Sequence, residues 1–301
     1  MTSAVPAEAP PRWRDKGPLP LATVLLVLLV FWYGAAIWLN APQVIDIAFR
    51  DKPDWTTRAL IETAWSMERP ILPAPHQIAQ EFYESVFERD IASRRSLAYH
   101  ATVTAAATLV GFAFGIILGV LLAVGIVHVR TLDRSLLPWI IASQTIPILA
   151  IAPMIIVVLG NIGFTGLLPK AIISMYLCFF PITIGMVKGL RSPDPLQLDL
   201  MRTYSASPAQ VLWKLRNPAS VPFLFASLKV AIGISLVGAI VGELPTGAQE
   251  GIGARLLSGS YYGQTVQIWS ALLMAALLGT ALVALVALAE RMTVRVMGAE
   301  R

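Results

Sequence analysis

Residues 188–217 read KGLRSPDPLQLDLMRTYSASPAQVLWKLRN, and this polar stretch separates two apolar runs that are each long enough to cross a bilayer. It is too short to form a domain and too polar to lie in lipid. Ser207 followed by Pro208 is typical of a helix start, because serine can cap a helix and proline fits its first position. We therefore expect two short helices joined at a turn, the second from Pro208 to Leu215 with Leu212 and Leu215 on its apolar side.

The chain on either side of this stretch has the composition of a membrane protein. Of its 301 residues, 56% are hydrophobic and 14% are charged, whereas a soluble protein carries about 25% charged residues. A segment that crosses lipid is helical, because a lone strand leaves its backbone groups unpaired, and it needs about 20 apolar residues. The sequence predicts an all-α integral membrane protein with six transmembrane helices: 19–39, 101–127, 135–159, 166–187, 221–242 and 268–289.

Lysine and arginine gather in alternate short loops, including the polar stretch, and this bias places those loops and both termini in the cytoplasm. Residues 1–18 are expected to form a disordered cytoplasmic tail, and residues 291–301 a second tail. In the external segment 40–100, an apolar stripe near 76–90 predicts an amphipathic helix, which lies at the membrane surface or packs on the spans. Residues 44–70 carry no assignable pattern. Residues 101–290 form a core of five spans with the cytoplasmic loop 188–217.

Several functions are disfavoured by the composition. The net charge of +5 reflects basic cytoplasmic loops, so no nucleic-acid partner is expected. The single cysteine, Cys178, cannot form an intrachain disulfide, and no spacing of histidine and cysteine predicts a metal site. A membrane-embedded enzyme needs clustered His, Asp, Glu or Cys at one depth, and the sequence of the spans contains no such cluster.

Three glycines on the second predicted span are spaced for close helix packing. Gly111, Gly115 and Gly119 are four residues apart, so they stay on one face of a helix and let a neighbouring backbone approach. That neighbour belongs either to the same chain, which we favour, or to a second copy. Prolines inside the third and fourth spans, among them Pro147, can kink those helices.

The polar stretch resembles the "EAA" loop of ABC-transporter permeases, specifically of the nitrate/sulfonate/taurine class. The family pattern is Glu-Ala-Ala, three residues, glycine, about nine residues, then a hydrophobic residue, any residue and Leu-Pro. The chain keeps this spacing and has matching residues at Arg202, Thr203, Ala206, Ser207 and Pro218.

The loop departs from the family pattern at several positions. It has Asp199 for glutamate, Leu200 and Met201 for the two alanines, Ser205 for glycine and Asn217 for leucine. The glycine position matters most. If Ser205 adopts a left-handed conformation, it costs roughly 1–2 kcal/mol that glycine would not.

Three further stretches resemble the same family in the same order: 71–75 (ILPAP), 144–147 (QTIP) and 237–243 (VGAIVGE). The resemblance covers about residues 71–289 and implies the type I importer permease fold in a bacterial inner membrane. In that family two permease subunits form a dimer, and two cytoplasmic ATP-hydrolysing subunits bind their EAA loops. An external binding protein delivers a small solute. It therefore implies a homodimer, with ATP and Mg on the partner ATPase and no cofactor on this chain.

The resemblance also implies which residues act. The chain has no GxxxxGK[ST] phosphate loop, so it is not expected to be an enzyme or its own motor. Coupling to the ATPase would rest on Asp199, Leu200, Met201, Arg202, Ser205, Ala206, Ser207, Leu212, Leu215 and Pro218.

Candidates for the solute pathway are Gln144, Thr145, Pro147, Tyr176 and Glu243. The carboxylate of Glu243, at the outer end of the fifth span, either helps to gate the pathway or is a hydrated interface residue. The alternative function is an ion-coupled secondary transporter. It predicts several acidic residues near mid-span, and the predicted spans hold almost none.

Overall fold

The computed structural model describes residues 19–50, 55–245 and 249–298, and the regular structure in these residues is entirely helical. This confirms the all-α class. The chain divides into two compact units, residues 1–80 and residues 81–301. Five described helices are long and apolar enough to cross a membrane, and a sixth span is present if one sharply bent pair of helices counts as one.

The N-terminal unit is built on α1 (Leu19–Ala48) and α2 (Thr57–Trp65). Helix α1 begins at the predicted residue but continues nine residues past the predicted end at Leu39. The extension is possible because buried Asn40 is fully satisfied. Its amide donates to the carbonyls of Ala64 and Leu72, and its Oδ1 accepts from the N–H groups of Ile71 and Leu72. A polar residue can therefore stand inside the helix without an unmet hydrogen bond.

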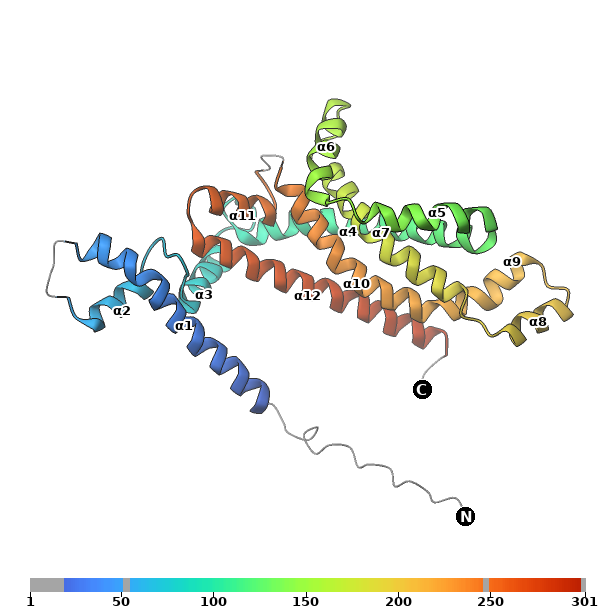
Figure 1. Ribbon diagram of the computed structural model, residues 1–301, viewed down its shortest axis with the longest axis horizontal. Helices are drawn as coiled ribbons and strands as arrows, with labels where there is room; N and C mark the ends of the chain where they lie inside the picture. The colour runs from blue at the N-terminus through green and yellow to red at the C-terminus, as the bar shows by residue number, and fades with distance from the viewer. Residues whose placement is uncertain (1–18, 51–54, 246–248, 299–301) are drawn as a thin grey trace, which may run out of the picture. The chain divides into compact units, whose positions relative to one another are not determined.

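The C-terminal unit is a bundle in which α4 (Leu97–His128), α7 (Leu167–Leu190) and α10 (Asn217–Glu243) lie against one another, with α12 (Thr265–Val296) alongside α10 (Figure 1). Helices α4, α10 and α12 contain their predicted spans and extend beyond them at both ends, whereas α7 begins one residue after the predicted start at Gly166 and ends three residues after the predicted end at Val187. The apolar core between them is formed by Phe112, Cys178, Ile182, Leu228, Ile232, Leu236, Leu282 and Val286.

The predicted glycine face of α4 lies against α7 of the same chain. A Cβ on Gly111 would stand 2.5 Å from the carbonyl oxygen of Ala171, and one on Gly115 would stand 2.2 Å from Sγ of Cys178. Gly119 faces Ile182 in the same way, at 2.9 Å. These glycines therefore bring α4 and α7 closer than any larger residue would permit.

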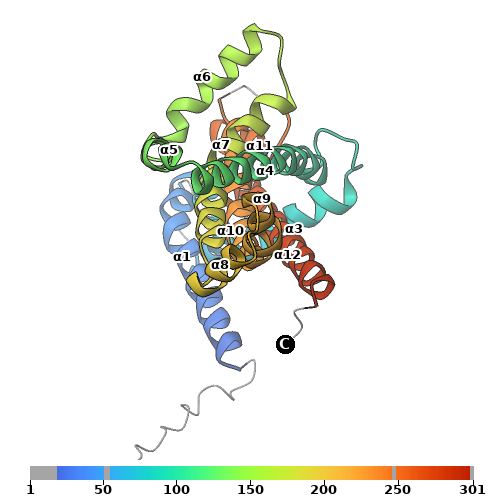
Figure 2. The same cartoon turned by 90° about the vertical axis from the view of Figure 1, so that its right-hand side faces the viewer.

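The predicted span 135–159 is not one straight helix. It consists of α5 (Arg130–Ser143) and α6 (Ile148–Asn161), which are bent by 98°. Pro147 lies directly before α6 and has no N–H to continue the hydrogen bonding of α5, and the hydroxyl of Thr145 donates to the carbonyl of Ala142 at 2.7 Å. Within the C-terminal unit, α6 points away from the bundle (Figure 2).

The amphipathic helix predicted near 76–90 is α3 (Pro75–Tyr83) followed by a π-helical turn, η2 (Glu84–Glu88). Phe82 and Val86 pack against Leu97, Ile252 and Ala271. The apolar stripe therefore covers other helices of the C-terminal unit, which is the second of the two roles considered for it. A further short helix, α11 (Ile252–Tyr261), was not predicted from the sequence.

Candidate functional site

The polar loop folds as the two short helices that the sequence predicts. Helix α8 (Pro195–Thr203) is capped by Asp194, whose carboxylate accepts from the N–H of Leu196, while the side chain of Gln197 accepts from the N–H of Asp194. Helix α9 (Pro208–Val211) is capped by Ser207 and Gln210 in the same reciprocal way. Such caps satisfy the free N–H groups of a helix start, so both helices hold their shape although they have little contact with the bundle.

The second helix does not stop at Leu215 as predicted. A π-helical turn, η3 (Leu212–Arg216), joins α9 to α10, and the combined helix runs for 36 residues from Pro208 to Glu243. In this turn the N–H of Asn217 bonds to the carbonyl of Leu212. The wider turn gives room for Pro218, whose ring would otherwise meet a carbonyl of the preceding turn. Helices α9 and α10 therefore form one continuous helix.

The turn between α8 and α9 contains a strained residue. Ser205 has a φ of +51°, and it is the only residue other than glycine with a positive φ among residues 19–50, 55–245 and 249–298. The turn closes through hydrogen bonds from Ser205 N–H to the carbonyl of Arg202, 2.8 Å, and from Ala206 N–H to the carbonyl of Met201, 3.0 Å.

Replacing Ser205 by glycine is expected to stabilise the loop by roughly 1 kcal/mol, because glycine adopts a positive φ without a steric penalty. The change should raise the melting temperature of the purified protein slightly and should slow the exchange of the Ala206 amide hydrogen. Ser205→Val is the matched control, and it is expected to lower the melting temperature and to speed the exchange of the Ala206 amide hydrogen. A Ser205→Gly protein less stable than the parent would show that the hydroxyl, and not the backbone conformation, decides the turn.

The surface of the loop is polar with several large apolar side chains exposed. Asp199 and Arg202 form an exposed ion pair at 2.8 Å. Leu196, Leu200, Tyr204 and Trp213 are between 56% and 77% exposed. Met201, Leu212 and Leu215 are half-buried, and Ser205, Ser207 and Pro218 are exposed. Trp213 is not among the residues predicted to couple to the ATPase, and its exposure identifies it as part of this surface.

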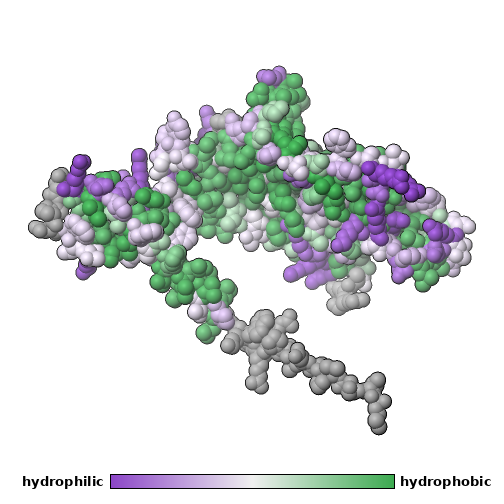
Figure 3. Space-filling model, in the orientation of Figure 1, coloured by the Kyte–Doolittle hydropathy of each residue, from purple (hydrophilic) through white to green (hydrophobic). Residues whose placement is uncertain are grey.

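Polar contacts fasten the loop to the ends of the bundle helices. Arg216 donates to the carbonyl of Leu190 at the end of α7, 2.8 Å away, and Arg191 pairs with Asp133 of α5 at 2.9 Å. A hollow of about 330 Å³ lies between the loop and the end of α4, with Val127 and His128 on one side and Leu198 and Val211 on the other. Hydrophobic side chains cover the middle of this unit, and hydrophilic ones gather toward the loop end (Figure 3).

At the opposite end of α10, Glu243 is completely buried. Its carboxylate accepts from the hydroxyl of Thr104 at 2.9 Å and from the N–H of Gly253 at 2.8 Å, and its Oε1 lies 3.9 Å from Nζ of Lys170. The hydroxyl of Thr104 also accepts from the N–H of Ile252. One carboxylate thus joins α4, α7 and α10 to the segment that begins α11.

His100 completes this cluster of buried polar groups. Its Nδ1 accepts from the N–H of Gly251 at 2.9 Å, and its Nε2 lies 2.8 Å from the carbonyl of Arg94. Because Nδ1 accepts and Nε2 donates, the ring is neutral. We call Thr104, His100, Lys170 and Glu243 the outer polar cluster. The sequence singled out Glu243 alone, since its three partners come from other helices.

The other pathway candidates lie elsewhere, at the bend between α5 and α6. Gln144 and Thr145 are in the connecting residues, Pro147 precedes α6, and the hydroxyl of Tyr176 on α7 donates to the carbonyl of Ser143. The structure therefore brings these four together and assigns Glu243 to the outer polar cluster. A carbonyl freed by the bend is satisfied by Tyr176, so the phenol fixes the bend to α7.

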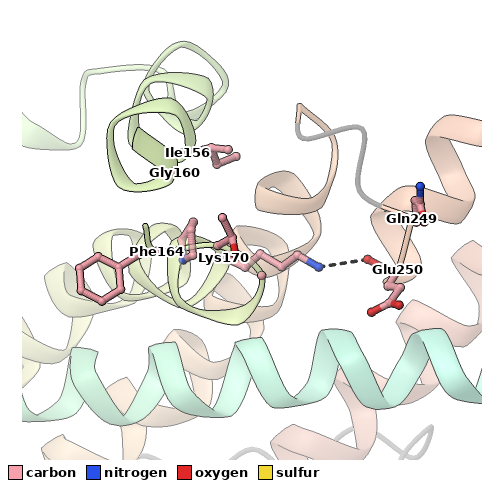
Figure 4. Close-up of a pocket in the computed structure, with 9 residues that line it drawn as sticks. Ile156, Gly160, Phe164, Lys170, Gln249 and Glu250 are labelled. Carbon is pink, nitrogen blue, oxygen red and sulfur yellow. Dashed lines mark hydrogen bonds between the residues drawn. The ribbon is translucent and has the colours of Figure 1, made fainter. Parts of the chain in front are cut away.

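A hollow of about 330 Å³ lies between α6, the start of α7 and the segment before α11. Ile156, Gly160 and Phe164 border it on one side, and Gln249 and Glu250 on the other (Figure 4). Lys170 extends across this space from α7, and its ammonium donates to the carbonyl of Glu250 at 3.0 Å. Because Lys170 also faces Glu243, it connects this hollow with the outer polar cluster.

These features define a helical membrane protein with several spans. A polar loop of two capped helices lies at one end of its bundle, and a cluster of buried polar side chains lies at the other. No group of three or more histidine, cysteine or acidic side chains that could hold a metal lies in the described parts of the chain.

Residues 115–297 match the family of binding-protein-dependent transport system inner membrane components, and the chain belongs to this family. It is an ABC-transporter permease of a bacterial inner membrane, in the nitrate/sulfonate/taurine importer class, as the sequence resemblance implied. It is not an enzyme, because ATP hydrolysis in this family belongs to a separate subunit.

Three relatives illustrate the range of the family. A probable ABC transporter permease of Haemophilus influenzae is 29% identical over 71% of this chain and 82% of its own length. A riboflavin transport system permease of Chloroflexus aurantiacus is 30% identical over 92% of this chain and 90% of its own length. A putative aliphatic sulfonates transport permease of Bacillus subtilis is 24% identical over 73% of this chain and 76% of its own length.

Proposed function

We propose that this permease serves an ATP-driven importer for a small solute, either a nitrate-, sulfonate- or taurine-like anion or a small heterocycle. We further propose that a separate ATPase drives it through residues 199–218. The main support is the construction of the loop: it consists of two capped helices and exposes Leu196, Leu200 and Trp213, and its second helix, α9, continues without interruption into α10. A short helix with an exposed apolar side is suited to a groove on a partner protein.

The contacts of the loop suggest how a movement of the loop, caused by the ATPase, would be transmitted to the helices of the bundle. The link from Arg216 to Leu190 joins the start of α10 to the end of α7, and α7 packs against α4 through its glycines. ATP must favour one arrangement of these helices and solute another, since a ligand that binds both states equally shifts nothing. The outer polar cluster lies at the far ends of the same three helices, where such a movement would open or close the solute entrance.

In the proposed assembly two copies of the chain pair with each other, two ATP-binding subunits hold the loops in the cytoplasm, and an external binding protein delivers the solute. Both termini are cytoplasmic in this arrangement. The exposed apolar side chains of α6, such as Leu149, Met154 and Val157, at 60% to 66% exposure, are suited to the second copy or to lipid. ATP and Mg belong to the ATPase.

The coupling role is tested by Leu200→Glu, which places a charge on the exposed apolar side of α8. If Leu200 enters a groove on the ATPase, losing its burial removes about 1.5–3 kcal/mol, and a buried carboxylate weakens the contact further. We expect at least tenfold less ATPase to co-purify with the variant and solute-dependent ATP hydrolysis to fall accordingly.

Val296→Glu is the matched control, because Val296 is also an exposed apolar residue, at the end of α12. It should leave ATPase recovery unchanged. Equal recovery of the ATPase with wild-type protein and Leu200→Glu, from samples of equal melting temperature, would count against the loop as the coupling element.

A further inference from the structure

A third hollow, of about 460 Å³, lies beside α11, and none of the five pathway candidates lines it. Helix α11 supplies one wall, and the residues around the start of α4 supply the other. The lining consists of Arg94, His100, Gln249, Ala254, Arg255, Leu257, Ser258, Tyr261 and Tyr262. Volumes of this size are typical of sites for small organic molecules.

Arg255 is the distinctive residue of this hollow. Its Nε is buried and has no hydrogen-bond partner in the described parts of the chain. The nearby carboxylate of Glu81 is engaged with Arg89, at 3.7 Å. Burial lowers the pKa of the Arg255 guanidinium from its ordinary value, and the neighbouring charge of Arg89 acts in the same direction. A buried donor without an acceptor is costly, so the guanidinium is suited to an anion from outside the chain.

The side chains of Arg94, Gln249 and His100 are already engaged with other groups of the protein. Arg94 donates to Gln249 at 3.0 Å and pairs with Glu250 at 3.1 Å. Both nitrogens of His100 are engaged with the backbone, Nδ1 with the N–H of Gly251 and Nε2 with the carbonyl of Arg94. The remaining wall is largely apolar or aromatic: Leu257 is 42% exposed, and the rings of Tyr261 and Tyr262 meet edge to face at 5.2 Å.

We propose that this hollow binds a small organic anion, with a carboxylate or sulfonate on the guanidinium of Arg255 and the carbon part against Leu257 and the two tyrosines. The planar guanidinium matches such oxyanions with two parallel hydrogen bonds. The inference rests on the proposed importer function, since the hollow would receive the solute next to the outer polar cluster. It selects the anion over the neutral heterocycle as the solute class.

The test uses the full-length protein in phosphatidylcholine nanodiscs and isothermal titration with three probes: benzoate, its neutral isostere benzamide, and inorganic sulfate. Benzoate should bind at least tenfold more tightly than benzamide, which lacks the charge, and than sulfate, which lacks the carbon part. Arg255→Gln should weaken benzoate binding at least tenfold, and Arg255→Lys should weaken it less. Arg58→Gln is the control, because the side chain of Arg58 is 88% exposed. It should leave the affinity for benzoate unchanged.

Leu257→Glu provides a second variant in case Arg255→Gln does not fold, because Leu257 is partly exposed and a carboxylate there would repel the anion. Absence of benzoate binding, or equal binding by wild-type and variant proteins, would overturn the site. Equal affinity for sulfate and benzoate would overturn the assignment to an organic anion. ATPase co-purification is measured on the same samples, so an unimpaired Arg255→Gln complex separates a failure at this hollow from a failure of the coupling loop.

Discussion

Replacing Gly115 by alanine is expected to destabilise the protein, and replacing Cys178 by alanine in the same molecule is expected to restore most of the loss. The added methyl group would lie 2.2 Å from Sγ of Cys178. Overpacking of this kind costs about 1–3 kcal/mol. Once the sulfur is removed, the nearest atoms are the nitrogen of Phe179 and Cβ of Cys178, at 3.6 and 3.7 Å, which are ordinary contact distances.

The measurement is the melting temperature of the detergent-solubilised single and double variants, analysed as a double-mutant cycle. Gly111→Ala should be at least as damaging as Gly115→Ala and should have no such rescue, because its new methyl group meets the backbone carbonyl of Ala171 at 2.5 Å. Gly233→Ala is the control, since nothing lies within 4 Å of that position. If Gly115→Ala melts like the parent, α4 and α7 do not approach as closely as described.

Removing the buried carboxylate with Glu243→Ala is expected to cost about 3–5 kcal/mol, the usual result of deleting one member of a buried ion pair. Lys170 would lose its counter-ion, and the N–H of Gly253 and the hydroxyl of Thr104 would lose their shared acceptor. The first turn of α11 should then detach from the bundle and become more mobile. We expect a clear fall in melting temperature together with faster amide exchange in residues 251–257.

Glu243→Gln should be milder, because the amide oxygen can still accept one of the hydrogen bonds. Glu290→Ala is the matched control. Its carboxylate pairs with Lys229 in a partly exposed position, where ion pairs contribute about 0–1 kcal/mol. Similar losses from Glu243→Ala and Glu290→Ala would contradict the view that the outer polar cluster holds the segment in place.

Features that depend on neighbouring residues could be predicted well. The apolar runs located the long helices, and Ser207 with Pro208 located the start of α9. The mismatch of Ser205 with a family glycine identified the strained turn between α8 and α9. Prediction failed for two different reasons. Hydrogen bonds from Asn40 to a distant part of the chain allow α1 to continue past its apolar run, and a local π-helical turn carries the helix through Pro218.

By itself, the sequence determined the class of protein, the approximate spans, the capped loop and the glycine face of α4, because each of these is encoded within a few residues or one helical repeat. Only the tertiary structure decided which groups surround Glu243, which carbonyl Tyr176 satisfies and that Nε of Arg255 lacks a partner among the described residues. Thr104 and Glu243 are 139 positions apart. Their hydrogen bond exists because three helices bring their ends together, and a pattern of neighbouring residues carries no information about that packing.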